Sequence, residues 1–272
     1  MNAIETDPYV EILGVKVQRR VGVCHPDAPI LDTFNLVVHV TDACPGACKF
    51  CCNTSRGFVL DVEKFKRDYE AIRSQVTIGN VFFTGGEPTL YWNKIKECLS
   101  VIDAPVTVHT MGIHLDQIDS PVNVSLSRHH WDHAVNEEIL GTKLPKNYLD
   151  SFPMKSRTNL ACNIIKGYVD NETDMSKVLD LSMEHGFPLV AFVGLMPIND
   201  YSKEFGTPIP KLAGEDSLKY RTFAYGKSCV CGNFCYHKDG KFQLYYTRHN
   251  TCPSVNRGGR IVYKNGVQPW FS

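Results

Sequence analysis

The sequence is organised around a short cysteine-rich stretch: Cys44-Pro45-Gly46-Ala47-Cys48-Lys49-Phe50-Cys51. Its three thiols have C-x3-C-x2-C spacing and directly follow the apolar residues 36–41. A [4Fe–4S] cluster normally takes four Cys ligands, so three thiols from one loop leave one iron open to a small molecule. Pro45 and Gly46 supply the turn that such a loop requires. Zinc is the alternative, because short Cys clusters often bind it.

A second motif follows about one strand and one helix later. Residues 81–88 have the composition of a buried strand that ends in the turn Gly85-Gly86-Glu87-Pro88. Such a turn can be purely structural, and Glu87 could simply cap the next helix. In their order and separation the two motifs resemble those of radical S-adenosylmethionine (radical SAM) enzymes, and Phe50, just before the third cysteine, agrees with that family's loop.

The resemblance implies a cofactor and a way to activate it. In this family the open iron is chelated by the amino and carboxylate groups of S-adenosylmethionine, and one electron from the cluster cleaves the sulfonium to a 5′-deoxyadenosyl radical. Cys44, Cys48 and Cys51 would then be the catalytic cluster ligands. An external one-electron donor such as flavodoxin or ferredoxin would supply the electron.

Further cofactor contacts are implied at the turn and at later strand ends. The turn Gly85-Gly86-Glu87-Pro88 would hold the methionyl ammonium, with Glu87 accepting a hydrogen bond and the glycines allowing close approach. Thr110-Met111-Gly112 is similar to the family's Thr-Asn-Gly segment, with Met in place of Asn. The other positions implied to contact the cofactor are Phe50, Thr110, Ser125, Ser127, Arg128, Asn163 and Val193. Arg128 suits a carboxylate because its guanidinium is planar and permanently charged; a surface arginine is the alternative.

Residues 127–133 are unusually polar and aromatic for a turn between a strand and a helix. We expect this segment to face the mouth of the barrel. His129, His130 and His133 are candidates for substrate contact or proton transfer near neutral pH. A solvent-facing or structural role is the alternative for the three.

Strand and helix patterns alternate from residue 36 onward. Strands are expected at 36–41, 80–84, 105–110, 122–127, 159–166 and 189–195, and helices at 61–75, 92–101, 133–140 and 174–184. This alternation predicts an α/β fold with parallel strands and chemistry at their C-terminal ends. The resemblance implies a partial (β/α)6 radical SAM barrel over residues 35–200. Residues 1–34 are expected to form a lead-in hairpin or loose strand.

Four cysteines lie in the C-terminal segment, residues 201–272: Cys229, Cys231, Cys235 and Cys252. The Asp239-Gly240 pair between β-prone runs predicts a hairpin. Together they resemble the auxiliary-cluster "twitch" or truncated SPASM region of some radical SAM enzymes, although Tyr245 stands where the longer version has Cys. We expect a small Cys-rich hairpin appendage with a second [4Fe–4S] cluster, and zinc is the alternative. Packed thiols are expected at Cys24, Cys52, Cys98 and Cys162.

Composition narrows the setting of the protein. The 272 residues include 29 Lys plus Arg and 29 Asp plus Glu, so the net charge gives no sign of nucleic-acid binding. The chain has 11 cysteines but no N-terminal signal-peptide pattern, which predicts a reducing, cytoplasmic location. No apolar run approaches the length of a membrane span.

The sequence therefore predicts an enzyme that abstracts a hydrogen atom from a small molecule, such as a sugar, nucleotide or amino-acid derivative, giving oxidation or rearrangement. A peptide-modifying radical SAM enzyme is the first alternative. An iron–sulfur electron carrier or redox sensor is an alternative of another class. Glu87 and the Gly-Gly turn argue against a carrier, because a carrier has no use for a pocket that binds such a cofactor.

Overall fold

The computed structural model describes residues 7–19, 33–53, 57–212, 216–220, 233–248 and 259–269. In these residues an 11-stranded sheet has the order β13-β12-β3-β4-β5-β6-β7-β8-β11-β10-β9. Its central strands are β3 (Thr33–Thr41), β4 (Thr77–Gly85), β5 (Val106–Thr110), β6 (Asn123–Ser127), β7 (Thr158–Ile164) and β8 (Leu189–Gly194). These six pair in chain order and in parallel.

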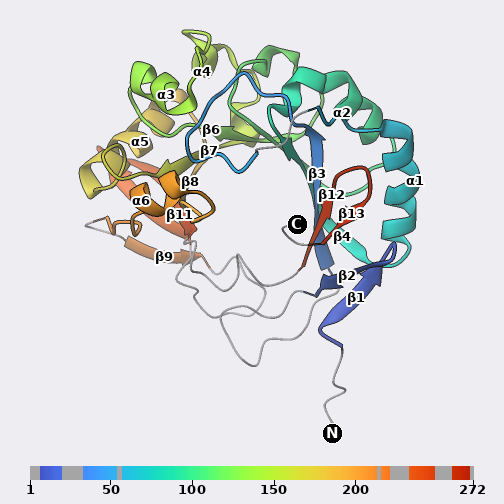
Figure 1. The fold of residues 1–272 in the computed structure, drawn as a ribbon. Helices are drawn as coiled ribbons and strands as arrows, with labels where there is room; N and C mark the ends of the chain where they lie inside the picture. The colour runs from blue at the N-terminus through green and yellow to red at the C-terminus, as the bar shows by residue number, and fades with distance from the viewer. Residues whose placement is uncertain are drawn as a thin grey trace, which may run out of the picture.

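Helical segments connect the parallel strands. The α-helices are α1 (Val62–Arg73), α2 (Trp92–Leu99), α3 (His133–Leu140), α4 (Tyr148–Ser151), α5 (Glu172–His185) and α6 (Asp200–Phe205). Short 3-10 segments are η1 (Pro88–Tyr91), η2 (Leu115–Gln117) and η3 (Lys155–Arg157). The sheet is curved, and the helices lie around its outer, convex side (Figure 1). The predicted α/β fold is confirmed, and the arrangement is consistent with a partial barrel.

Helix α1 illustrates how the sequence builds this layer. The Asp61 side chain accepts a hydrogen bond from the Lys64 backbone N–H at 2.9 Å, which caps the helix at its N-terminus. One face of α1 is buried, and on it Phe65 packs against Phe83 of β4 and Tyr263 of β12. Since side chains alternate along a strand, the neighbours of Phe83 and Tyr263 in sequence point to the opposite, concave face.

The C-terminal strands extend this sheet at both edges. They are β9 (Asp216–Tyr220), β10 (Asn233–Lys238), β11 (Lys241–Arg248), β12 (Arg260–Tyr263) and β13 (Val267–Gln268). Strand β11 pairs in parallel with β8, and β12 pairs in parallel with β3. The β10–β11 hairpin turns at Asp239 and Gly240, which both have positive φ. This hairpin continues the central sheet next to β8, where an open parallel edge offers unpaired backbone groups.

Residues near the N-terminus form a separate hairpin, which is one of the two structures, a hairpin or a loose strand, expected from the sequence. Strands β1 (Tyr9–Ile12) and β2 (Val15–Gln18) pair antiparallel around Leu13 and Gly14, both at positive φ. None of the helices in the described ranges is long and apolar enough to cross a membrane.

Candidate active site

The cysteine loop begins where β3 ends and rests on two neighbouring elements. The Ala47 N–H donates to the carbonyl oxygen of Leu140, at the end of α3, at 2.9 Å. Gly46 lies so close to β5 that an added Cβ would sit 2.7 Å from Cε of Met111 and 3.0 Å from the Leu140 oxygen. A larger residue at position 46 would therefore require the Met111 side chain to move and the Leu140 carbonyl to shift slightly.

The three thiols of the loop lie within electrostatic reach of one another. Cys44 and Cys48 are partly buried, while Cys51 is exposed. Burial raises the pKa of Cys48 to about 12, with further contributions from Cys51 and Cys44. Burial also raises the pKa of Cys44, although the Gly46 N–H, 3.4 Å from its Sγ, acts in the opposite direction. The Asn53 N–H donates to Cys51 Sγ at 3.3 Å.

Three thiols on one loop are a donor set that an iron–sulfur cluster can use. In the described part of the chain, no group of three or more His, Cys, Asp or Glu side chains converges closely enough to hold one metal ion. A zinc site requires ligand atoms about 2.0–2.3 Å from one point. In a [4Fe–4S] cluster each thiolate binds a different iron, so thiols from one loop need not converge.

The Gly-Gly-Glu-Pro turn is bonded directly to the backbone that enters the cysteine loop. The Gly86 N–H donates to the Thr41 oxygen at 2.6 Å, and the Glu87 N–H donates to the Ala43 oxygen at 2.8 Å. A Cβ on Gly86 would overlap the Ala43 oxygen, and one on Gly85, whose φ is 128°, would overlap the Thr41 oxygen. The two glycines therefore allow close approach between the two motifs, a role that the sequence resemblance did not assign to them.

The Glu87 carboxylate joins the ends of β4 and β5. It is 1% exposed. Its Oε1 accepts from the Thr89 N–H at 3.1 Å, the Thr89 hydroxyl at 2.6 Å and the Thr110 hydroxyl at 2.7 Å. Its Oε2 accepts from the Met111 N–H at 2.8 Å. Glu87 also caps η1, and Pro88 is the first residue of that segment, so the structural alternative for this residue is present in the fold.

Arg128 is a buried cation directly after β6. The residue is 2% exposed, so the alternative of a surface arginine is wrong. Nη1 donates to the Tyr148 hydroxyl at 3.1 Å and Nη2 to the Trp131 carbonyl at 2.7 Å. Its buried Nε has no hydrogen-bond partner, and no carboxylate of the described residues pairs with the guanidinium. A buried guanidinium with a spare donor suits a bound anionic group.

Two of the three candidate histidines are held by backbone donors. His129 accepts at Nδ1 from the Asn163 N–H at 3.1 Å, and its ring meets Phe50 edge-on at 5.3 Å. Burial, then the charge of Arg128, lowers the pKa of His129 to about 4, so the ring is neutral. His130 accepts at Nδ1 from the Asp132 N–H at 3.0 Å and stacks on Trp131, and burial lowers its pKa.

These contacts favour the structural alternative for His129 and His130. His133 begins α3, with Nε2 3.3 Å from Glu137 Oε1. Substrate contact by the three histidines stays a prediction.

The remaining candidate residues lie along adjacent strands. The Ser125 hydroxyl accepts from Asn159 Nδ2 at 3.4 Å, and Ser127 pairs in register with Ala161. Asn163 of β7 and Val193 of β8 are register partners. The strand pairing therefore places these candidates on neighbouring strand ends, and their cofactor contacts stay predictions.

The other cysteines differ in their surroundings. Cys98 and Cys162 are buried, as predicted, but Cys52 is exposed and the prediction of a packed thiol is wrong, because the chain faces solvent as it leaves the cysteine loop. Cys235 is buried on β10, with Sγ 3.2 Å from His237 Nε2. Four cysteines lie outside the described residues: Cys24, Cys229, Cys231 and Cys252.

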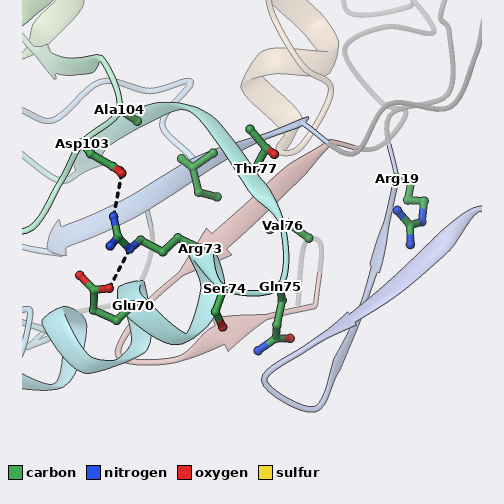
Figure 2. Close-up of a pocket in the computed structure, with 10 residues that line it drawn as sticks. Arg19, Glu70, Arg73, Ser74, Gln75, Val76, Thr77, Asp103 and Ala104 are labelled. Carbon is green, nitrogen blue, oxygen red and sulfur yellow. Dashed lines mark hydrogen bonds and ion pairs between the residues drawn. The ribbon is translucent and has the colours of Figure 1, made fainter.

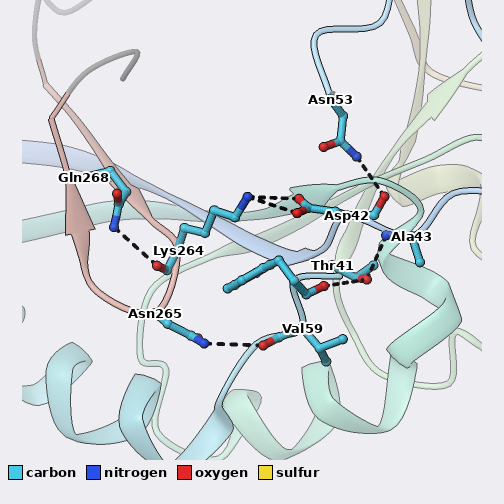
Figure 3. A network of polar contacts seen from close by, with 9 residues as sticks. Thr41, Asp42, Ala43, Asn53, Val59, Lys264, Asn265 and Gln268 are labelled. Carbon is cyan, nitrogen blue, oxygen red and sulfur yellow. Dashed lines mark hydrogen bonds and ion pairs between the residues drawn. The ribbon is translucent and has the colours of Figure 1, made fainter. Parts of the chain in front are cut away.

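Polar residues that the sequence did not single out hold the base of the loop (Figure 3). Lys264, in the turn after β12, donates to both oxygens of Asp42 at 3.1 Å. Asn53 Nδ2 donates to the Asp42 carbonyl at 3.0 Å, and Asn265 Nδ2 donates to the Val59 carbonyl at 3.4 Å. Asp42 and Lys264 are 222 positions apart, and only the β3–β12 pairing brings them together. No local pattern in the sequence could have identified them.

A surface pocket lies at the opposite end of the strands (Figure 2). It is lined by the end of α1, the start of β4 and the segment before β5. Arg73 bridges Glu70 and Asp103 there, at 2.7 Å to each, so its charges are already paired. In folds with parallel strands the chemistry lies at the C-terminal ends, where the cysteine loop is. We therefore assign the candidate active site to the loop rather than to this pocket.

Known proteins resemble this chain in fold. No curated protein is significantly similar in sequence. Among solved structures, SuiB of Streptococcus suis bound to precursor peptide SuiA has a TM-score of 0.54 and 17% identity over 66% of this chain and 43% of SuiB. SuiB bound to S-adenosylmethionine has a TM-score of 0.53 and 16% identity over 63% and 43%. A structure of TYW1 with a lysine-pyruvate adduct has a TM-score of 0.43 and 20% identity over 62% and 66%.

At these identities the similarity concerns the fold. This chain spans less than half the length of SuiB, 43%. Residues 38–152 match the model of the Radical SAM superfamily. This matched segment contains both the cysteine loop and the Gly-Gly-Glu-Pro turn.

Proposed function

We propose that this protein cleaves S-adenosylmethionine reductively and abstracts a hydrogen atom from a small-molecule substrate, such as a sugar, nucleotide or amino-acid derivative, giving oxidation or rearrangement. The observation that carries the proposal is the direct bonding of the two motifs. The Gly86 and Glu87 N–H groups donate to Thr41 and Ala43, so the cofactor-binding turn and the cysteine loop form one rigid unit. A carrier or sensor has no need of that turn.

Five residues of the candidate active site have proposed roles. Cys44, Cys48 and Cys51 would hold a [4Fe–4S] cluster with one open iron, which with S-adenosylmethionine supplies the hydrogen-abstracting radical chemistry. Glu87 would orient the methionyl ammonium through the free acceptor capacity of its carboxylate. Arg128 would bind the methionyl carboxylate through the donor that has no partner among the described residues. An external donor such as flavodoxin or ferredoxin would supply electrons in a reducing cytoplasm.

The test is release of 5′-deoxyadenosine. Anaerobically reconstituted protein is reduced with dithionite, mixed with S-adenosylmethionine, and assayed by liquid chromatography and mass spectrometry. Formation of 5′-deoxyadenosine that depends on both reductant and protein supports the proposal. A cluster that is reduced and reoxidised without any 5′-deoxyadenosine would favour the electron carrier or sensor.

We further propose a second cluster bound by Cys229, Cys231, Cys235 and Cys252. The support is their number and spacing in the sequence, together with the buried thiol of Cys235 on the edge hairpin. In a variant with Ala at Cys44, Cys48 and Cys51, reconstitution should leave about four irons per chain, as in one [4Fe–4S] cluster. If that variant binds zinc and no iron, the C-terminal site has a structural role and no redox role.

Peptide modification is the second candidate function. It is favoured by the similarity in fold to SuiB, which was solved with its precursor peptide SuiA. Products formed from candidate peptides, and not from small molecules, would support it.

A further inference from the structure

The concave face of the sheet carries an unusual charge distribution. The eight parallel-paired strands β3 to β8, β11 and β12 contain no Asp or Glu among their described residues. The same strands carry Arg248 and Arg260 near their ends. A face whose described strand residues include cations and no acids is electrostatically suited to an anion.

The strand geometry places both arginines on this concave face. Tyr245 of β11 packs against Phe192 of β8 on the convex side, so alternation turns Arg248, three positions later, to the concave side. Tyr263 of β12 packs against α1 on the convex side, so Arg260, three positions earlier, is also concave. The two arginines therefore project from opposite edges of the parallel sheet toward its hollow side.

His109 indicates that the charges of the two arginines reach the same region of the concave face. It lies on β5, with its ring 5.4 Å from Phe82 of β4, and it lies within the hollow of the concave face, where it is accessible but surrounded by protein. In a flat sheet β11, four strands away, would be about 19 Å from β5 at the usual strand spacing. Burial is the main cause that lowers the pKa of His109, to about 4. The charges of Arg248 and Arg260 both lower it further, despite this spacing. The curvature of the sheet brings both guanidinium groups near the same neutral imidazole.

Arg248 is free to take part in binding. Among the residues that the structure describes, Arg248 has no ion-pair or hydrogen-bond partner, whereas Arg260 has contacts of its own. Two guanidinium groups directed at one region repel each other, and an oxyanion between them would remove that repulsion while accepting charge-assisted hydrogen bonds. Phe82 and the neutral His109 would offer an apolar surface and one polar contact beside it.

We propose that the concave face binds an anionic group of the substrate, a phosphate or a carboxylate, between Arg248 and Arg260 and beside His109. This inference makes the proposed function more specific, and it rests on that function because only there is the bound ligand the substrate. It narrows the substrate from any small molecule to a phosphorylated or carboxylated one. A neutral sugar or nucleoside would offer the Arg248 guanidinium no charged partner.

The test measures binding of two simple probes, inorganic phosphate and succinate, to reconstituted protein by isothermal titration calorimetry. We expect at least one probe to bind, and Arg248→Met and Arg260→Met each to weaken it by about tenfold or more. Arg248→Lys should retain part of the affinity because it keeps the charge. Arg157→Met is the matched control, since Arg157 lies in the segment before β7 and donates to the Pro121 carbonyl; this variant should bind the probe normally.

The outcomes distinguish a phosphorylated from a carboxylated substrate. They also distinguish failure of this inference from failure of the proposed function. Tighter binding of phosphate indicates a phosphorylated substrate, and tighter binding of succinate a carboxylated one. Binding that is unchanged in Arg248→Met, or no binding of either probe, overturns the inference. Arg248→Met is decisive because Arg248 has no hydrogen-bond or ion-pair partner among the described residues, and thermal unfolding of both Met variants checks that they are folded. Cleavage of S-adenosylmethionine without an anion site refutes this inference alone, whereas an Arg248-dependent anion site without cleavage refutes the proposed function alone.

Discussion

Lys264 and Asp42 form an ion pair that joins the last strands of the chain to the start of the cysteine loop. The Lys264 ammonium lies 3.1 Å from both carboxylate oxygens. The Asp42 side chain is 1% exposed and the Lys264 side chain 30%. Because Asp42 directly follows β3, this pair fixes the direction in which the chain enters the loop. The C-terminal edge of the sheet is therefore part of the support of the candidate active site.

Replacing Lys264 by Met should destabilise the protein. The substitution removes the cation from a buried carboxylate, and we expect the free energy of unfolding to fall by about 1–3 kcal/mol. Lys203→Met is the control: its pair with Asp200 is largely exposed and should contribute less than about 1 kcal/mol. Urea unfolding of both variants measures the difference. Equal stabilities would mean that the Lys264–Asp42 pair does not support the loop.

Gly86→Ala should separate the two motifs. The new Cβ would overlap the Ala43 carbonyl oxygen, which belongs to the backbone and has little room to move. We expect lower stability and less iron bound after reconstitution. Gly186→Ala is the control, because Gly186 has positive φ but no atom within 4 Å of the added Cβ, so it should cost only about 1–2 kcal/mol of backbone strain. Normal iron content in Gly86→Ala would contradict the close contact described above.

Glu87→Ala should weaken both the fold and cofactor binding. The Thr110 hydroxyl and the Met111 N–H would lose their acceptor. Affinity for S-adenosylmethionine should fall by about 1.5–3 kcal/mol, the worth of one charge-assisted hydrogen bond. Glu63→Ala, at an exposed position on α1, serves as the control. If titration gives the wild-type affinity in a folded Glu87→Ala protein, the carboxylate is structural only.

The buried, neutral His129 predicts a loss of stability in acid. Its pKa is lowered from 6.5 to about 4 in the folded protein, so between these values the unfolded chain binds the proton more readily. The neutral ring contributes its full stability above pH 6.5, and this contribution is lost as the pH falls toward 4. At pH 5 the loss amounts to up to about 2 kcal/mol of the free energy of unfolding. In His129→Asn, where the amide oxygen can replace Nδ1 as acceptor, unfolding of cluster-free protein should depend less on pH between 7.5 and 5. A slope equal to that of the wild type would refute the assignment.

The elements that the sequence could predict are those with local determinants. The expected helix at 133–140 has the observed bounds of α3 because Asp132 caps it and Gly141, at positive φ, ends it. The four-residue helix α4 and the six-residue helix α6 were missed, since neither is long enough to show a clear helical period.

The site was predictable to a similar degree. The cysteine loop and the Gly-Gly-Glu-Pro turn are contiguous motifs, and their residues were identified in advance. The partners of these motifs were not, because the Lys264–Asp42 pair and the concave position of Arg260 depend on the parallel pairing of β12 with β3. Register between strands so far apart in the chain follows from the whole sheet and leaves no local pattern.

The most direct test of the account compares two single cysteine substitutions in the same assay. Cys48 belongs to the three-thiol loop, while Cys98 is buried in α2 outside it. After anaerobic reconstitution and reduction, we expect Cys98→Ala to release 5′-deoxyadenosine from S-adenosylmethionine at close to the wild-type rate, and Cys48→Ala to release none while its circular dichroism stays that of the folded protein. Release at the wild-type rate by Cys48→Ala would contradict the claim that this loop holds the radical-generating cluster.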